Sequence, residues 1–436
     1  MSERDVVITG MGLTSSLGKN TGENWRSVGA MKTGIIHDPK DDLPDYLQYM
    51  GRVPEYIMPQ DIAPKQIGQM KFLNRSAIFG FCAASEAVSH AREGLQDTEP
   101  GRRALYVAAG DFTKIGCDAV YPALKDGTGN KWESIDYAKL NASALNKVNP
   151  FFLLESLNNN LFSFLSAYVE FMGPGTSLAS LSPYGGNALE LACRAIRQDK
   201  ADAALAVGYG SWINDIVLYE LEGLGILSKC RHGSGSFRPF DVSRDGFIPG
   251  EGGAAIFLES SEKARQRGAN ILGRIRGVSN AIEFSPGHKF SVPDTVCKRS
   301  VLSVMEDAAC SVSDLAFIIP HGSGTQKGDR SELNSVTDIF NEQKADAPLC
   351  ALKPYTGHMG AASDIAEIIV GIHAVQEGTV PATLNFHAAE KSFSDLKISA
   401  SPQVCDRNMF LSISYGVGGQ SSTVVVEVPA SKGHNE

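Results

Sequence analysis

Short apolar runs alternate with longer amphipathic stretches along the chain. The runs are rich in Val, Ile and Ala, and they predict strands at residues 5–10, 104–110, 203–210, 254–258, 315–320 and 409–414. Stretches with apolar residues at helical spacing lie between them, at residues 77–91, 187–197 and 361–376. Such alternation predicts an α/β fold with buried sheets. Because Gly ends several strands, we expect the functional loops to gather at the strand carboxyl ends.

The chain of 436 residues is long for one compact unit, so two domains or a duplicated fold is expected. A turn-rich segment at 245–253 lies near the middle, and we place the division of the chain near residue 255. Residues 1–255 then form one half and residues 256–430 the other, although no clear sequence repeat connects them. We expect the polar tail at 431–436 to fray.

Composition and charge exclude several classes of protein. Apolar residues make up 43% of the chain and charged residues 20%, as in ordinary globular enzymes. The formal charge of −9 argues against nonspecific nucleic-acid binding. No apolar run reaches the roughly 18 residues of a membrane span. The charged N-terminus leads directly into a predicted strand and does not resemble a signal peptide.

The sequence offers no metal or cofactor motif. Eight cysteines are scattered without a CxxC pair, which indicates reduced structural thiols in a cytoplasmic protein. No group of Cys and His has the spacing of metal ligands. Because a P-loop and a GxGxxG motif in a strand–helix context are both missing, we expect no nucleotide or redox cofactor.

The segment SLASLSPYGGN places Ser182 and Pro183 directly before a predicted helix. Ser is a preferred N-cap and Pro a preferred first helical residue, so Ser182 could serve only to cap this helix. Alternatively, its hydroxyl lies at the positive helix end, roughly half an elementary charge, where free backbone N–H groups could hold an acyl oxyanion. The segment by itself favours the capping interpretation.

Two further segments carry histidines beside turns. In PHGSGT, His321 follows a predicted strand and has hydroxyls next to it. In KPYTGHMG, Lys353 and His358 lie five residues apart across a turn that precedes a helix. A lysine near a histidine lowers the imidazole pKa by charge repulsion and keeps the ring neutral. Each of these residues could also be an ordinary loop residue, and the Gly-rich SYGVGGQ near the C-terminus is a weak signal by itself.

In this order and spacing, the segments resemble the β-ketoacyl-ACP synthases of fatty-acid and polyketide synthesis. HGSGT is similar to the family's HGTGT motif, KPYTGHMGAA to its K…TGH..GAAG motif, and SYGVGGQSS to its FGFGGTN loop. The opening DVVITGMGLTSSLG and the mid-chain FRPFDVSRDGFIPGEGGAAIFLE resemble two further signatures. Collinear matches nearly from end to end imply a thiolase-like fold, with two similar halves in an α-β-α-β-α layered architecture.

The resemblance implies roles for single residues. His321 and His358 match the histidines that hold the malonyl thioester carbonyl while CO2 leaves. Lys353 matches the family lysine, and Glu367, fourteen residues later, fits its acidic partner. The remaining matches are two acidic residues after the first histidine, two hydroxyls that contact the pantetheine arm, and two backbone N–H groups of the oxyanion hole: Asp329 and Glu332, Ser323 and Thr325, and Ser182 and Val417.

Two positions depart from the family pattern. Ser182 stands where the acyl-carrying cysteine stands, and Val417 replaces the phenylalanine whose ring gates acyl entry. A helix N-terminus lowers a thiol pKa from about 8.5, but it cannot turn an alcohol into an alkoxide. Ser182 would therefore need a neutral base, for which the sequence offers His358 or His321.

Several functions are compatible with this combination. The first is a condensing enzyme of fatty-acid or type II polyketide biosynthesis that acts on acyl-ACP and malonyl-ACP, with acyl transfer through Ser182 or directly from ACP. The others are a chain-length-factor-like partner in a ketosynthase heterodimer, a malonyl-ACP decarboxylase, an ester- or amide-forming acyltransferase, and a non-enzymatic binding module. An engineered Cys→Ser change is disfavoured because Leu181 and Pro183 depart from the pattern too. The retained histidines, lysine and glutamate favour an enzyme over a purely structural partner.

The implied partners are acyl carrier protein and a second ketosynthase-type subunit, in a homo- or heterodimer. ACP is acidic, as this chain is, so docking requires a local basic patch. Lys65 and Lys71 lie in a region that resembles the family's docking edge, although they could equally be solvated surface lysines. The unusual Ser182 favours a specialised polyketide or polyene pathway over housekeeping fatty-acid synthesis.

Overall fold

The computed structural model describes residues 4–40, 43–110, 117–155, 157–180, 182–285 and 292–429, so the predicted fraying of residues 431–436 lies outside the described residues. Within them, nine strands form one sheet in the order β5-β4-β6-β7-β1-β8-β13-β12-β9. Their bounds are β1 Val6–Thr14, β4 Arg103–Ala109, β5 Gly175–Ala179, β6 Ala203–Ser211, β7 Glu251–Ser260, β8 Gly273–Ile282, β9 Leu315–Ile319, β12 Met409–Tyr415 and β13 Gln420–Glu427. Two short pairs lie outside this sheet, β2 Ile36–His37 with β3 Tyr49–Met50 and β10 Thr379–Val380 with β11 Gln403–Val404.

The strand order repeats between the two halves of the chain. Read outward from the middle of the sheet, the first half runs β1-β7-β6-β4-β5, and the second runs β8-β13-β12-β9, with a further parallel bridge from Ile318 to Leu349. Strand directions agree as well, because β7 and β13 each pair antiparallel with both neighbours while β4 and β9 pair parallel with β6 and β12. Residue 255 lies inside β7, and the change from one set to the other falls between β7 and β8. A division near residue 255 stays a prediction.

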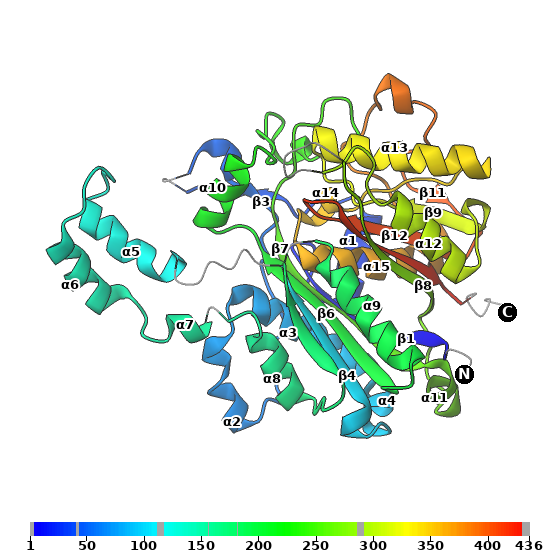
Figure 1. Cartoon of the computed structure of the whole chain (residues 1–436), viewed down its shortest axis with the longest axis horizontal. Coiled ribbons are helices and arrows are strands. Elements are labelled where there is room, and N and C mark those ends of the chain that lie inside the picture. The colour runs from blue at the N-terminus through cyan, green and yellow to red at the C-terminus, as the bar shows by residue number, and fades with distance from the viewer. Residues whose placement is uncertain are drawn as a thin grey trace.

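Helices cover the two sets of strands and separate them (Figure 1). On the first set, α3 packs against β1, β6 and β7, and on the second, α12 packs against β8 and β13. Between the sets, α9 and α15 pack on each other and reach strands of both. The described helices are α1 Thr21–Gly29, α2 Pro64–Ile67, α3 Arg75–His90, α4 Arg92–Gln96, α5 Cys117–Thr128, α6 Tyr137–Lys147, α7 Phe152–Glu155, α8 Asn160–Tyr168, α9 Tyr184–Arg197, α10 Asp215–Gly223, α11 Ser261–Gln266, α12 Lys298–Ala308, α13 Gln326–Gln343, α14 Lys353–Thr356 and α15 Ala361–Gln376. The result is the layered α/β architecture that the resemblance implies.

The N-terminal ends of α9 and α15 meet at a close approach of backbone to backbone. A Cβ atom on Gly185 would lie 2.1 Å from the carbonyl oxygen of Ala361, and one on Gly208 would lie 2.4 Å from it. Glycine at both positions therefore lets α15 approach α9 and β6. Every residue of α15 from Ala361 to Ile372 is buried, as expected for a helix enclosed between the two sets of strands. This contact places the first turns of α9 and α15 next to each other.

The predicted strands and helices are found near their expected positions, with one instructive difference. The helix that follows Ser182 begins at Tyr184, its N-cap is Pro183, and no side chain caps it. The interpretation of Ser182 as an N-cap and Pro183 as the first helical residue is therefore wrong. Instead, a carboxylate on α15 accepts hydrogen bonds from both the Ser182 hydroxyl and a backbone N–H of α9.

An arm built from α5, α6 and α7 projects from the body of the molecule (Figure 1, left). Helices α5 and α6 pack mainly on each other. Several large apolar side chains of this region are exposed, among them Trp132, Tyr137, Leu145, Phe151 and Leu153. Exposed apolar groups of this size on a projecting element are typical of a surface that contacts a partner.

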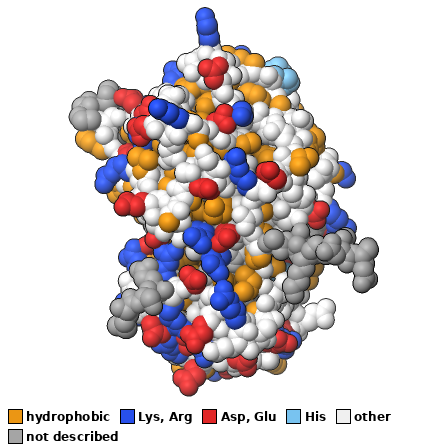
Figure 2. All heavy atoms as spheres, turned by 90° about the vertical axis from the view of Figure 1, so that its right-hand side faces the viewer, with side chains coloured by type: hydrophobic (Ala, Val, Ile, Leu, Met, Phe, Trp, Pro, Cys, Tyr) orange, Lys and Arg blue, Asp and Glu red, His pale blue; other side chains and the backbone are white. Residues whose placement is uncertain are grey.

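The opposite side of the molecule is a mixed-charge surface. Figure 2 shows lysine and arginine side chains gathered in the lower middle of this face, with carboxylates and apolar side chains among them. Among the described residues, no helix has the length and apolar character needed to span a bilayer.

Candidate active site

Two histidines, a lysine and a glutamate predicted from separate segments lie together: His321 follows β9, Lys353 begins α14, His358 precedes α15 and Glu367 lies on α15. Lys353 Nζ donates to the backbone carbonyl of His321 at 2.7 Å and to Glu367 Oε1 at 2.8 Å. The ring centroids of His321 and His358 are 5.2 Å apart. All four side chains are buried. The structure therefore joins these residues into one cluster, with Lys353 connecting the loop of His321 to α15.

Both imidazoles are held in a defined neutral form. The backbone N–H of Tyr415 donates to His321 Nδ1 at 3.5 Å, and that of Gly360 donates to His358 Nδ1 at 3.1 Å. A ring nitrogen that accepts a hydrogen bond carries no proton, so in each neutral ring the proton lies on Nε2. The pKa of each imidazole lies well below its usual value, because of burial first and the charge of Lys353 second. The sequence predicted the repulsion by lysine, but burial is the larger cause.

Aromatic rings that the sequence analysis did not identify enclose the histidines. Trp212, which follows β6, stacks on His358 with centroids 4.4 Å apart, and Phe247 lies 5.1 Å from the same ring. Tyr415 lies 4.2 Å from His321. These rings exclude water and fix the orientation of both imidazoles. Tyr415 and Phe247 belong to segments that carried a signal in the sequence, the Gly-rich SYGVGGQ and the mid-chain FRPFDVSRDGFIPGEGGAAIFLE, whereas Trp212 lies in neither.

Two buried carboxylates shape the turn after His321. Glu332 accepts the backbone N–H groups of His321 at 2.7 Å and of Gly322 at 2.9 Å, and burial raises its pKa to about 8. Asp329 accepts the backbone N–H of Gly324 at 2.9 Å. Both residues lie on α13, and their hydrogen bonds to backbone N–H groups fix the loop. Their contribution is to position the histidine loop.

The hydroxyls of Ser323 and Thr325 are engaged within the same loop. Their oxygens are 2.8 Å apart, Ser323 Oγ donates to Asp329 at 3.0 Å, and Thr325 caps α13 through the backbone N–H of Gly328. Tyr415 Oη also lies 3.2 Å from Ser323 Oγ. The structure assigns both hydroxyls a role in loop geometry. Their contact with a pantetheine arm stays a prediction.

Ser182 is buried and its hydroxyl has a carboxylate partner. Its Oγ donates to Asp364 Oδ1 at 2.5 Å, and the backbone N–H of Gly185 donates to Asp364 Oδ2 at 3.0 Å. The hydrogen-bond partner of the serine hydroxyl is therefore Asp364. A base role for His321 or His358 stays a prediction. Asp364 was missed because it reaches the site from a helix far away in the chain. Its position three residues before Glu367, on the same face of α15, is the signal that could have revealed it.

The turn between β12 and β13 lies directly against Ser182. A Cβ atom on Gly416 would be 2.2 Å from the carbonyl oxygen of Ser182, so only glycine fits there. Val417 follows in this turn and is partly exposed. Residue 417 thus directly follows the glycine that contacts the backbone of residue 182, in keeping with a paired oxyanion hole. That role for their N–H groups stays a prediction.

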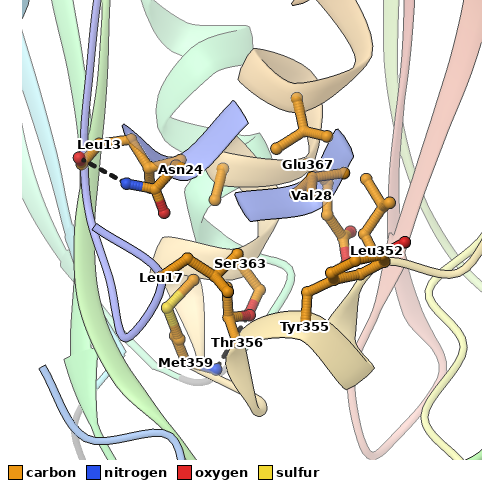
Figure 3. Close-up of a pocket in the computed structure, with 12 residues that line it drawn as sticks. Leu13, Leu17, Asn24, Val28, Leu352, Tyr355, Thr356, Met359, Ser363 and Glu367 are labelled. Carbon is orange, nitrogen blue, oxygen red and sulfur yellow. Dashed lines mark hydrogen bonds between the residues drawn. The ribbon is translucent and has the colours of Figure 1, made fainter. Parts of the chain in front are cut away.

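Glu367 also lines a small cavity of about 20 Å³ (Figure 3). Leu13, Leu17, Val28, Leu352 and Met359 supply most of its apolar lining. Glu367 Oε2 and Tyr355 Oη, from two residues that line it, have no hydrogen-bond partner among the described residues. A cavity of this size has room for about one water molecule.

The described residues contain no cluster of three or more His, Cys, Asp or Glu side chains that could hold a metal ion. The described cysteines are unpaired thiols. Burial raises the pKa of Cys193, in α9, to about 12, so this thiol stays protonated at neutral pH. The polar groups gathered in the site are the imidazoles, the lysine, the carboxylates and the serine hydroxyl.

Solved structures place the fold among the ketosynthases. The chain resembles a beta-ketoacyl synthase from Burkholderia phymatum with a TM-score of 0.82 at 22% identity, and 98% of this chain and 99% of that one are covered. It resembles the ishigamide ketosynthase/chain length factor with a TM-score of 0.81 at 21% identity and the same coverage. These likenesses establish a thiolase-like, layered ketosynthase fold.

Sequence comparisons identify the family. Residues 3–264 match the model of the beta-ketoacyl synthase N-terminal domain and residues 284–387 that of the C-terminal domain, so the chain belongs to the beta-ketoacyl synthase family. Among its relatives, a 3-oxoacyl-[acyl-carrier-protein] synthase 2 of Coxiella burnetii is 25% identical over 98% of this chain and 99% of its own length. Nodulation protein E of Rhizobium leguminosarum bv. trifolii is 25% identical over 97% of this chain and 98% of its own.

Proposed function

We propose that this chain is a ketosynthase-type transferase of fatty-acid or type II polyketide biosynthesis that acts on malonyl-ACP and acyl-ACP by decarboxylative chemistry. The observation that carries the proposal is the pair of buried neutral imidazoles, each with its proton on Nε2 and with ring centroids 5.2 Å apart. Two such donors suit a thioester carbonyl oxygen that gains negative charge as CO2 leaves.

The surroundings of the histidines support this chemistry. When the bond between the malonyl α-carbon and its carboxylate breaks, the electron pair moves onto the thioester carbonyl and forms an enolate. Hydrogen bonds from His321 and His358 then strengthen with the growing charge, in a site from which aromatic rings exclude water. Lys353 acts through His321 by fixing its backbone carbonyl at 2.7 Å. Lys353 is therefore a positioning residue in this proposal.

Ser182 occupies, in our proposal, the position of the family's acyl-carrying cysteine. Support comes from its place before α9, its burial, and the contact of Gly416 with its carbonyl oxygen. A serine ester is a poorer acyl donor than a thioester, so condensation through Ser182 should be slower than through a cysteine. The decarboxylating residues do not depend on this replacement.

The proposed partners are acyl carrier protein and a second ketosynthase-type subunit. One solved relative, with a TM-score of 0.81, is a type II PKS ketosynthase in complex with its acyl-carrier protein. In this chain, strand β5 ends the sheet and pairs only with β4 among the described strands, and the arm with exposed apolar side chains projects from the same half. An open sheet edge beside an apolar arm is suited to a symmetric or pseudo-symmetric subunit contact.

The direct test is CO2 release from malonyl-ACP carrying a labelled carboxylate. We expect His321→Ala and His358→Ala each to lower the rate by at least about 100-fold, the usual contribution of a positioned donor. His387→Ala is the matched control, because the side chain of this histidine is 73% exposed and does not belong to the cluster. Release at the control rate in both cluster variants would refute the proposal.

A chain-length-factor-like partner role is the second candidate, favoured by the serine at position 182 and by the ketosynthase/chain length factor relative. It predicts acylation of a cysteine on a co-purifying subunit and no acyl mass on this chain. A non-enzymatic binding module predicts that His321→Ala leaves the biological output unchanged.

A further inference from the structure

The hydroxyl of Ser182 meets a buried carboxylate that no part of the histidine–lysine chemistry uses. Asp364 Oδ1 accepts this hydroxyl at 2.5 Å, and the residue is 2% exposed. An ionised carboxylate can only accept hydrogen bonds, so the serine proton points at Asp364 and the oxygen lone pairs point elsewhere. General-base catalysis requires a nucleophile whose proton is hydrogen-bonded to an acceptor group.

We propose that Asp364 is the general base that activates Ser182 to form an acyl ester. This inference rests on the proposed function, since it assumes an acyl thioester in the same site. It replaces the histidine base expected from the sequence. It also leaves His321 and His358 neutral and available as donors throughout the reaction.

Hydrogen bonds and a nearby positive charge favour the ionised form of Asp364, whereas burial opposes it. Its carboxylate accepts hydrogen bonds from Ser182, from the backbone N–H of Gly185 at 3.0 Å and from the hydroxyl of Ser414, and the charge of Lys353 acts in the same direction. Burial is the larger effect and raises the pKa above its usual value. A carboxylate with a raised pKa takes a proton from an alcohol more readily than an exposed one.

The proposed step conserves atoms and charge. Ser182 Oγ attacks the thioester carbonyl carbon while its proton moves to Asp364 Oδ1, and an oxyanion forms on the carbonyl oxygen. The carbon–sulfur bond then breaks, and the proton passes from Asp364 to the leaving pantetheine sulfur. The products are an ester on Ser182 and a carrier protein with a free thiol, and Asp364 returns to its ionised form.

A purely structural role for Asp364 is the competing explanation. Its Oδ2 links α15 to the first turn of α9 through Gly185, and this link would stabilise the fold whatever Ser182 does. The two explanations predict different results when the nucleophile is changed from serine to cysteine. A carboxylate assists an alcohol as a base, but it opposes a thiol because it raises the thiol pKa by like charge.

The experiment therefore compares Asp364→Asn in two backgrounds. Intact-protein mass spectrometry follows the rate of acyl transfer from a panel of saturated acyl-ACPs, acetyl to dodecanoyl, to the unaltered chain, Asp364→Asn, Ser182→Cys, and Ser182→Cys with Asp364→Asn. Asn keeps the size of the side chain and an oxygen for Gly185. Ser182→Ala supplies the background without a nucleophile.

We expect the substitution to act in opposite directions. With serine, Asp364→Asn should slow acylation by at least about 100-fold, the loss of a general base. With cysteine, it should accelerate acylation by about tenfold, the effect of lowering the thiol pKa by about one unit. A loss in both backgrounds would assign Asp364 a structural role and overturn the proposal, as would acylation of the serine at an unchanged rate.

A second measurement serves if the Asn variants do not fold. The pH dependence of iodoacetamide alkylation of Ser182→Cys reports the thiol pKa with Asp364 in place, and we expect a value above the usual 8.5 or so. A value below about 7 would show that no ionised carboxylate faces this position, and it would overturn the proposal. Absence of acyl mass on Ser182 together with normal CO2 release from malonyl-ACP would refute this inference alone, whereas loss of CO2 release would refute the proposed function.

Discussion

Replacement of Glu367 by Gln gives a quantitative test of the buried lysine–glutamate pair. Burial raises the pKa of Glu367 from 4.5 to about 7, even though Lys353 opposes the shift. Between these two values the folded state binds more protons than the unfolded state, so stability falls as the pH rises. Each pKa unit corresponds to about 1.36 kcal/mol, so the raised pKa is equivalent to about 3 kcal/mol of lost stability.

At about pH 5, Glu367 is mostly protonated and resembles glutamine, so the substitution should change the free energy of unfolding little. At about pH 8, the original protein carries the full penalty of an ionised buried carboxylate and the Gln variant does not. We therefore expect the variant to gain about 3 kcal/mol relative to the original chain between these two conditions.

The assay is urea-induced unfolding at both pH values, with the free energy of unfolding extrapolated to water. Glu262→Gln, at an exposed position on α11, is the matched control and should show no such difference. A stability difference that stays constant with pH would mean that Glu367 does not titrate in this range. It would refute the reasoning from burial.

Three further predictions follow from single contacts. Gly185→Ala would place a methyl group 2.1 Å from the Ala361 carbonyl oxygen, so we expect a loss of at least about 3 kcal/mol in urea unfolding. Trp212→Phe removes the indole N–H bond to the carbonyl of Gly110, and calorimetry should show about 2 kcal/mol of destabilisation; an unchanged melting temperature would contradict this. Lys65→Glu should weaken ACP binding in a titration, and equal affinity would exclude α2 from the docking edge.

Much of the fold could be predicted because its strands have a clear local pattern. Strands β4 and β6 are buried on both faces, and their sequences are continuous apolar segments for this reason. His321 and His358 were found because each stands at a turn beside a recognisable motif. Lys353 and Glu367 were paired through the family resemblance, and the structure shows their contact at 2.8 Å.

The rest of the site depends on contacts between residues that are far apart in the sequence. Asp364 acts on Ser182 over a separation of 182 residues, and Trp212 reaches His358 from the other half. Local preference alone therefore predicted Ser182 as a helix cap. The tertiary contact with Asp364 overrides this preference, because a buried carboxylate satisfies both the hydroxyl and the N–H of Gly185.

The shared middle layer makes the two repeated halves a single cooperative folding unit. Helix α15 of the second half packs on β6 and β7 of the first, while α9 of the first packs on β8 and β13 of the second. Each half alone would leave an apolar helix without the surface that buries it. A chain cut between residues 264 and 284, where the two family-model matches separate, would therefore give two aggregation-prone fragments, and autonomous modules are not expected.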